Sequence, residues 1–168
     1  WLPEDALEKL YTLLKTNKTD YATGLTKYVH SDRIARSGVA LSKIAYNKVD
    51  LKHFRKSFYH LAPAGRMIKA SVIKKNHIQF PEMIFGEDLQ FFAEVFFNTK
   101  RISTTQDVVY CANRYDDNIS LVKSEKSTHI NRMKWQGEAY RHLMSKYKNN
   151  KLMPNLLYRI INKDVLEA

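Results

Sequence analysis

Two neighbouring carboxylates, Glu87 and Asp88, stand directly after Gly86 and before a run rich in phenylalanine. Glycine lets the chain turn sharply, and the apolar run after it predicts a buried helix that begins there. Because N–H groups at a helix N-terminus stabilise negative charge, we predict that a carboxylate here is ionised at neutral pH, and such a carboxylate can serve as a general base. Acidic residues in a first helical turn are also common as plain caps, and the spacing alone favours that interpretation.

A second segment, residues 110–120, carries groups that suit an anionic ligand. Hydrogen bonds to phosphate oxygens are available from Arg114, from the amide of Asn118 and from the hydroxyl of Ser120. Asp116 and Asp117 lie between them, and two carboxylates in a polar loop are more typical of a turn than of a metal site.

A third segment follows the turn at residues 63–65 and contains two cations, Arg66 and Lys69. Both side chains suit contact with an anionic sugar donor or acceptor. A basic edge that simply faces water explains them equally well.

The hydrophobic pattern predicts the elements that position these residues. Apolar side chains recur every three or four residues in helices expected at about 3–16, from 86 onward and at about 128–147. The stripes expected to face the core in the first and third of these helices are Leu7, Leu10, Tyr11 and Leu14, and Ile130, Met133, Gly137, Tyr140 and Met144.

Strands and loops complete the predicted chain. Runs of β-forming residues predict strands at 21–30, 101–105 and 108–112. Residues 67–75 are expected to form a short strand that runs into a helix, residues 78–80 to end a strand, and residues 31–62 to form a loop with short elements. With a last helix after Pro154, the mixture predicts an α/β (mixed α+β) fold.

The composition limits the classes of function. The 168 residues carry a formal net charge of +11, which attracts polyanions. Cys111 is the single cysteine, so an intrachain disulfide is excluded and we predict a small core residue in a strand. The sequence has no apolar run of membrane-spanning length, no signal-peptide pattern, no P-loop, no dinucleotide fingerprint and no catalytic-triad motif.

Taken in order, these segments resemble a family 2 glycosyltransferase. Residues 2–11 and 20–24 are similar to the helix and strand that follow the family's metal-binding Asp-x-Asp. Residues 66–92 match its segment with a Gly-Glu-Asp helix start, and residues 110–120 match its Tyr…Asn-x-Ser loop. The similarity covers about residues 1–122 and is nearest to the bacterial cell-surface and teichoic-acid transferases.

The resemblance implies an inverting transfer of a sugar from a nucleotide-diphosphate donor to a hydroxyl acceptor, in cell-surface glycan or teichoic-acid synthesis. Asp88 would be the general base, Glu87 would bind or orient the acceptor or the base, and Arg66 would line the donor side. The loop over the donor diphosphate would contain Arg114, Asn118 and Ser120. A phosphate-rich polymer or a lipid-linked molecule would serve as acceptor, and the enzyme would be cytoplasmic, at the inner face of the membrane.

The same resemblance divides the chain into residues 1–122, the acceptor-side part of a GT-A catalytic domain, and residues 123–168, a helical C-terminal extension. The family's opening strand, its uracil-binding aspartate and its Asp-x-Asp are absent, so we expect an incomplete GT-A-type nucleotide-diphospho-sugar transferase fold followed by C-terminal helices. We expect no metal site, cofactor or turnover in this chain alone, and Mg²⁺ or Mn²⁺ in the intact enzyme. Uncovered sheet edges would favour homo-oligomers, and the last helices peripheral membrane contact.

Two other classes of function stay open. The charge and the ten tyrosines suit a basic nucleic-acid-binding module, although the aromatic residues follow apolar helical stripes and no motif for sequence-specific nucleic-acid binding is present. The third class is a non-catalytic interaction domain in which Glu87 and Asp88 only cap a helix.

Overall fold

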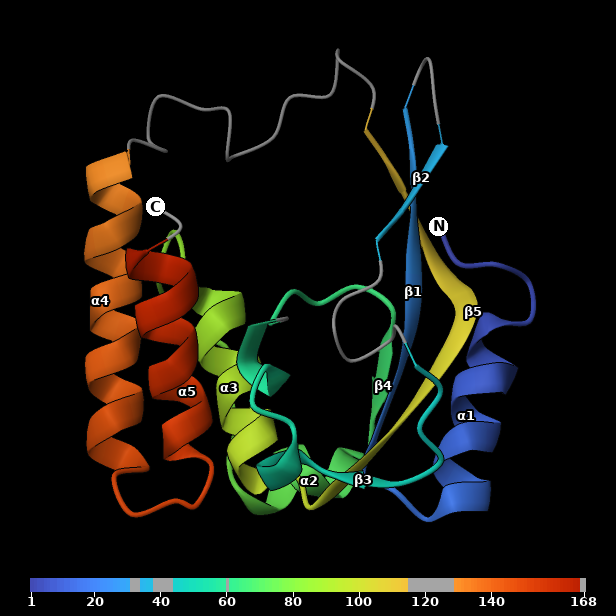
Figure 1. Cartoon of the computed structure of the whole chain (residues 1–168), viewed down its shortest axis with the longest axis horizontal. Helices are drawn as coiled ribbons and strands as arrows, with labels where there is room; N and C mark the ends of the chain where they lie inside the picture. Colours follow the sequence, from blue (N-terminus) through green and yellow to red (C-terminus); the bar gives the residue numbers. More distant parts are fainter. Residues whose placement is uncertain (31–33, 38–43, 60, 115–128, 167–168) are drawn as a thin grey trace.

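The computed structural model describes residues 1–30, 34–37, 44–59, 61–114 and 129–166, and Figure 1 shows a sheet with helices on both faces. The helices are α1 (Ala6–Asn17), α2 (Ala70–Lys75), α3 (Glu87–Asn98), α4 (His129–Lys146) and α5 (Met153–Arg159), which continues into a π-helical segment at Ile160–Val165. The strands are β1 (Tyr21–Val29), β2 (Ile34–Ser37), β3 (Val49–Asp50), β4 (Arg66–Ile68) and β5 (Arg101–Asn113). The predicted mixed α/β fold is therefore confirmed.

The centre of the sheet is the parallel pair of β1 and β5, with β3 antiparallel beside β5. The other edge of β1 is shared by two antiparallel strands, because β4 pairs with Tyr21–Thr23 and β2 with Thr26–Val29. β5 is a single strand, so the predicted break at residues 106–107 is wrong. These residues are accommodated within β5 because its register against β1 shifts on either side of Leu25.

The two faces of the sheet bury different side chains, because successive residues of a strand point to opposite faces. Tyr21 meets Phe96 of α3, with ring centroids 5.2 Å apart, whereas Ala22 belongs to the cluster that contains Ala6 and Leu10 of α1. β1 therefore has α1 on one side and α3 on the other, and α4 and α5 form an outer layer over α3 (Figure 1).

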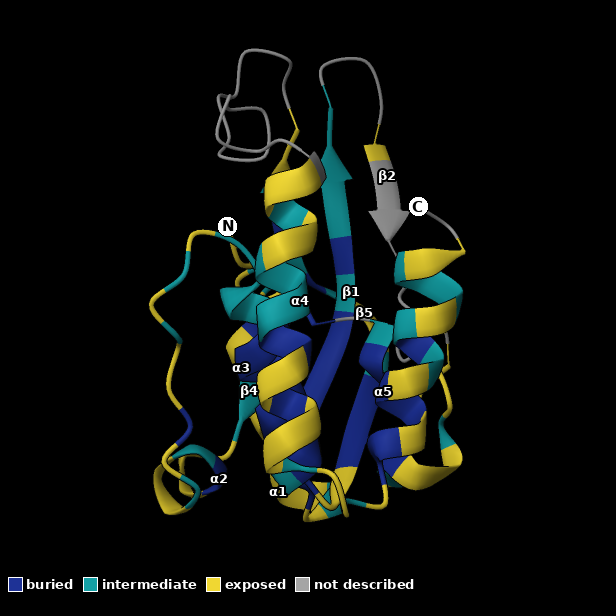
Figure 2. Cartoon of the chain, turned by 90° about the vertical axis from the view of Figure 1, so that its left-hand side faces the viewer, coloured by how far each residue is buried: buried dark blue, intermediate teal, exposed yellow. Residues whose placement is uncertain are grey.

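α3 is the most deeply buried helix of the described chain. All residues from Leu89 to Phe97 are buried, as the dark blue core of Figure 2 shows. A helix buried all round needs partners on more than one side. The sheet and Phe58 supply them on one side. On the other side they come from α4 and from Tyr147, the residue after it, whose ring stacks on Phe97.

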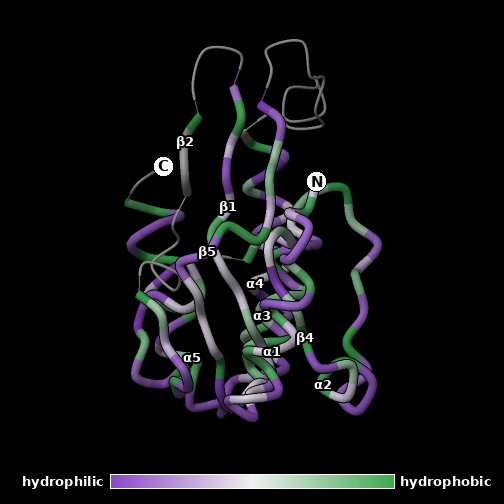
Figure 3. Tube along the Cα trace, turned by 90° about the vertical axis from the view of Figure 1, so that its right-hand side faces the viewer, coloured by the Kyte–Doolittle hydropathy of each residue, from purple (hydrophilic) through white to green (hydrophobic). Residues whose placement is uncertain are grey.

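The predicted apolar stripes are wrong in part, since Leu7 of α1 is 58% exposed and Ile130 of α4 is 78% exposed. The buried contacts of α1 come instead from Ala6 and Leu10. Figure 3, seen from the α1 side, shows hydrophobic and hydrophilic positions interspersed along the chain, and such a pattern fits more than one helix face. The buried positions in the second half of α4 are Ala139, Tyr140 and Leu143.

Cys111 is a buried free thiol in β5, as predicted. Residues 78–80 form no strand, so the strand end predicted there is wrong. One hydrophobic cluster contains residues from Tyr21 to Leu156, so the last helices and the sheet share a core, while the domain boundary at residue 122 stays a prediction. Within the described part of the chain, no helix has both the length and the apolarity to cross a bilayer.

Candidate functional site

The connection between α3 and β5 places the beginning of α3 toward the carboxyl end of the sheet. α3 ends at Asn98 and β5 begins at Arg101, so the chain reverses within two residues and the two elements run in opposite directions. β1 is parallel to β5. Ligands of open α/β sheets bind outside the carboxyl ends of the parallel strands, which makes the beginning of α3 a candidate position for a site.

Gly86 produces the turn that starts α3. Its φ of +87° lies in the left-handed region, which glycine adopts without a steric penalty. The helix then begins at Glu87, as the sequence predicts. The first helical hydrogen bond runs from Gln90 N–H to the Gly86 carbonyl at 2.9 Å. Asp88 is therefore held in the first turn of a helix whose following residues are buried.

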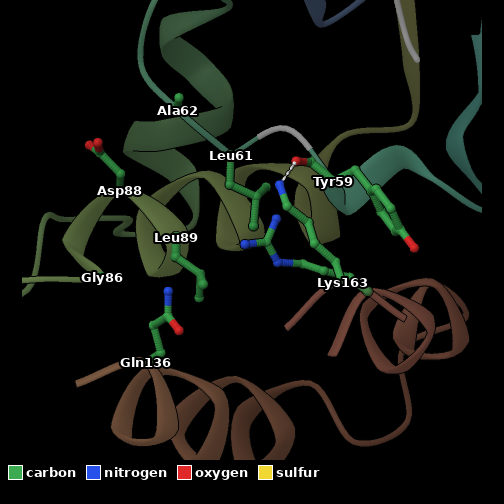
Figure 4. A pocket seen from close by; sticks show the side chains of 9 residues that line it. Tyr59, Leu61, Ala62, Gly86, Asp88, Leu89, Gln136 and Lys163 are labelled. Atoms are coloured by element: carbon green, nitrogen blue, oxygen red, sulfur yellow. Dashed lines mark hydrogen bonds between the residues drawn. The ribbon is translucent and has the colours of Figure 1, made fainter. Parts of the chain in front are cut away.

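Asp88 lines an open pocket of about 280 Å³, a volume near the lower end for small-molecule sites. Side chains from the segment before β4, from the start of α3 and from the last two helices surround it (Figure 4). The lining residues are Tyr59, Leu61, Ala62, Gly86, Asp88, Leu89, Gln136, Arg159 and Lys163. Glu87, the neighbouring carboxylate, does not line this pocket.

The pKa of Asp88 is raised above its ordinary value, mainly because the carboxyl is partly buried and also because Glu87 carries like charge. The positive charge of Arg66 acts in the opposite direction but does not cancel these effects. That the carboxylate is ionised at neutral pH stays a prediction. A carboxylate with a raised pKa is a stronger base, which suits proton abstraction.

Arg159 is a buried cation beneath this pocket, with 8% of its side chain exposed. Its Nη1 donates to the Phe58 carbonyl at 2.7 Å, and its Nε lies 3.0 Å from the Tyr140 hydroxyl and 3.2 Å from an Asp164 oxygen. Tyr140 also donates to Asp164. These bonds attach the last helix to the segment before β4 and give the pocket a fixed wall.

Lys163 lines the same pocket and donates from Nζ to the Tyr59 carbonyl at 2.9 Å (Figure 4). Arg159, Lys163 and Gln136 were not predicted as site residues from the sequence, because their helices lie outside the part of the chain that resembles the transferase family. One signal could have found the first two: residues four apart lie on the same face of a helix, and both are cations.

Arg114 is placed in a second hollow, of about 510 Å³, beyond the end of β5. Its guanidinium lies 5.1 Å from the centre of the Tyr28 ring, and its backbone N–H donates to Val29. Ala62 lines both this hollow and the Asp88 pocket, so the two are neighbours. Asn118 and Ser120 lie outside the described residues, as do Asp116 and Asp117.

Arg66 is brought to α3 rather than to open solvent. Its guanidinium carbon lies 4.5 Å from the centre of the Phe92 ring, and its Nε donates to the Ala64 carbonyl at 3.3 Å. Nη1 and Nη2 are buried and have no hydrogen-bond partner among the described residues. A buried donor left unpaired costs about 1–3 kcal/mol, so this arrangement requires an explanation.

The described residues do not form a cation site. No group of three or more His, Cys, Asp and Glu side chains in these segments could hold a metal ion. The Mg²⁺ or Mn²⁺ expected for the intact enzyme stays a prediction.

Comparison with models of protein families and with curated proteins finds no match. Among solved structures, the chain is similar to TarS from S. aureus. A structure of TarS 1-349 with UDP-GlcNAc aligns with a TM-score of 0.59 and 19% identity over 89% of this chain and 48% of that one. The same TarS fragment with UDP aligns with a TM-score of 0.58 and 19% identity over 89% of this chain and 46% of that one. A further TarS structure aligns with a TM-score of 0.53 and 25% identity over 68% of this chain and 20% of that one.

These likenesses support a glycosyltransferase-like fold. The chain spans about half the length, or less, of the TarS structures that it matches.

Proposed function

We propose that this chain is the acceptor-side part of an inverting family 2 glycosyltransferase of the GT-A type, which transfers a sugar from a nucleotide diphosphate to a hydroxyl group in cell-surface glycan or teichoic-acid synthesis. The observation that carries the proposal is Asp88, a partly buried carboxylate with a raised pKa at the start of α3, where it lines an open pocket. The fold shared with a protein solved with UDP-GlcNAc supports it independently.

In the proposed mechanism, Asp88 accepts the proton of the acceptor hydroxyl while the hydroxyl oxygen attacks the anomeric carbon of the donor sugar. The bond between that carbon and the diphosphate oxygen breaks, and the nucleoside diphosphate leaves with the electron pair. A single displacement of this kind inverts the configuration at the anomeric carbon. Glu87, next to Asp88, would help to bind or orient the acceptor.

The donor diphosphate is assigned to the side of Arg114, in the hollow that shares Ala62 with the Asp88 pocket. Asn118 and Ser120 belong to the same proposed loop. We also propose that the intact enzyme uses a divalent cation, Mg²⁺ or Mn²⁺. We place the enzyme in the cytoplasm at the inner face of the membrane, with a phosphate-bearing or lipid-linked acceptor.

The test is sugar transfer by the intact protein that contains this chain, with UDP-GlcNAc as the first donor tried. Asp88→Asn keeps the size of the side chain but removes the base, so we expect transfer to fall by about 10²–10⁴-fold. Glu82→Gln is the matched control, because Glu82 is an exposed carboxylate nearby that does not line the pocket. Its rate should match that of the unmodified protein.

A near-normal rate for Asp88→Asn, with donor binding retained in calorimetry, would remove Asp88 as the base. Product analysis by NMR tests the stereochemistry separately, since retention at the anomeric carbon contradicts a single displacement. The nucleic-acid alternative receives no support from the aromatic side chains of α3, because Phe91, Phe92, Phe96 and Phe97 are buried in the core.

A further inference from the structure

The position of Arg66 is determined by two aromatic rings. Arg66 pairs with Thr23 in the ladder between β4 and β1, and its side chain reaches α3. The guanidinium carbon lies 4.5 Å from the centre of the Phe92 ring and 5.9 Å from that of Tyr21. A planar guanidinium that stacks on an aromatic face has a restricted orientation. The cation is therefore held in place, although within the described segments only its Nε has a hydrogen-bond acceptor.

The other two nitrogens of Arg66 are buried donors without an acceptor among the described residues. Arginine does not lose its proton in proteins, so the charge persists inside the molecule. Buried charges are normally paired, and the described side chains form no salt bridge with this one. Because both nitrogens are closed off from solvent, a donor phosphate does not reach them as the structure stands.

The nearest acidic candidate follows from the geometry of α3. Phe92 lies four residues after Asp88, and residues four apart lie on the same face of a helix. A cation over the Phe92 ring is therefore on the face of α3 that carries Asp88. The positive charge of Arg66 also acts to lower the pKa of Asp88, against the larger effects of burial and of the charge of Glu87.

The other charged groups around Asp88 do not offer the same possibility. Glu87 has like charge. Arg159 is already bound to the Phe58 carbonyl and to Asp164, and Lys163 donates to the Tyr59 carbonyl. Gln136, which lines the pocket from α4, is neutral.

We propose that Arg66 is a positioning residue for Asp88. Its Nη donors make no hydrogen bond to the carboxylate in this structure, so it acts through electrostatic pairing of its buried charge with the carboxylate, which holds the ionised side chain toward the acceptor hydroxyl. The catalytic part of this statement rests on the proposed function, whereas the pairing does not. It replaces the expectation that Arg66 contacts the sugar donor. On this basis the cation favours the ionised form of Asp88, against the burial and the charge of Glu87.

The first experiment follows the Asp88 carboxyl carbon by NMR in this chain labelled with ¹³C-aspartate, assigned by loss of its signal in Asp88→Asn. Arg66→Met removes the charge but keeps an apolar contact with Phe92, so the titration midpoint of Asp88 should shift upward. Arg66→Lys keeps the charge and should give a smaller shift. Lys69→Met is the matched control, since Lys69 pairs with Asp20 and should leave Asp88 unchanged.

An unchanged or lower midpoint in a folded Arg66→Met protein would overturn the proposal. If that variant does not fold, the unmodified chain still provides a test through the ¹⁵Nη signals of Arg66. These signals should change as Asp88 titrates and should not change over the same pH range in Asp88→Asn. Signals that respond equally in both proteins would also overturn the pairing.

The second experiment uses the intact transferase and separates positioning from donor binding. Arg66→Met should lower kcat by about 10–100-fold, the size expected when a reacting group is misplaced, with little change in KM for the nucleotide sugar. A raised KM with an unchanged kcat would assign Arg66 to the donor instead. Because the NMR readout needs no turnover, an inactive protein or an active Asp88→Asn would contradict the proposed function without deciding the pairing.

Discussion

Glu94 offers the sharpest quantitative test of how α3 is held in the core. Its side chain is only 4% exposed, and its carboxylate accepts hydrogen bonds from Lys146 Nζ at 2.6 Å and from the Tyr147 hydroxyl at 3.1 Å. His142 Nε2 lies 2.9 Å from the other oxygen. All three partners come from α4 or the residue that follows it, so this one carboxylate joins the outer helical layer to α3.

We predict that Glu94→Gln lowers the free energy of unfolding by about 2 kcal/mol. Hydrogen bonds to a charged group contribute about 1.5–3 kcal/mol each. Lys146 and His142 are 42% and 44% exposed, so water replaces part of what they lose, which reduces each bond to about 1 kcal/mol. Lys146 and Tyr147 share one oxygen, so a glutamine whose carbonyl stands there loses the bond to His142, about 1 kcal/mol, and the negative charge behind the other two bonds, about 0.5 kcal/mol each. In a chain of this size the melting temperature should fall by about 4–8 °C.

The pH dependence tests the same idea. Burial alone would raise the pKa of Glu94, but the hydrogen bonds from Lys146 and His142 and the charge of Lys146 lower it overall. A carboxyl with a lowered pKa stabilises the fold above its unfolded value, about 4.3, and this contribution is lost as the pH falls through the folded value. The difference between the two proteins should therefore shrink in acid.

Urea denaturation at pH 7, 4 and 3, followed by circular dichroism, measures both effects. Glu8→Gln is the control, because Glu8 is an exposed carboxylate on α1, and such substitutions usually change stability by less than about 0.5 kcal/mol. Glu94→Gln that behaves like this control at pH 7 would contradict the role of the carboxylate. A difference between Glu94→Gln and the unmodified chain that stays constant down to pH 3 would contradict the lowered pKa.

Three further predictions concern single positions. Gly86→Ala should lower the free energy of unfolding by about 1–2 kcal/mol because φ is +87°. Gly137→Ala is the control, since its added Cβ meets nothing, and it should raise that free energy by about 0.5–1 kcal/mol. Equal effects of the two in thermal melts would contradict the role of the turn. Gly24→Ala would bring a Cβ within 2.8 Å of the Asp107 carbonyl. We therefore expect the free energy of unfolding, measured in urea, to fall by about 1–3 kcal/mol. An unchanged urea midpoint would show that the strands can move apart. The pKa of Asp88 is raised in the folded chain, so its ionisation lowers the free energy of unfolding as the pH rises toward that pKa. Asp88→Asn should therefore be at least as stable as the unmodified chain at pH 7. A clearly lower free energy of unfolding for this variant would mean that the carboxylate supports the fold.

Local features of the sequence were enough to predict the start of α3 and the position of Asp88. Glycine adopts the left-handed turn at Gly86 without a steric penalty, and burial of the phenylalanine-rich run after it is strongly favourable. The strand β1 was predicted nearly to the residue for a similar reason, since its β-forming residues lie between polar turns. These features depend on neighbours in the chain, which a sequence displays directly.

Tertiary contacts decided the rest. The spacing of apolar residues in α1 fits two faces, and the sheet selected the one with Ala6 and Leu10. Arg159 and Lys163 became part of the Asp88 pocket only because the last helix packs against the segment before β4. The pKa of a carboxyl and the burial of a guanidinium depend on charges and apolar groups brought together from distant parts of the chain, and no pattern along one segment contains that information.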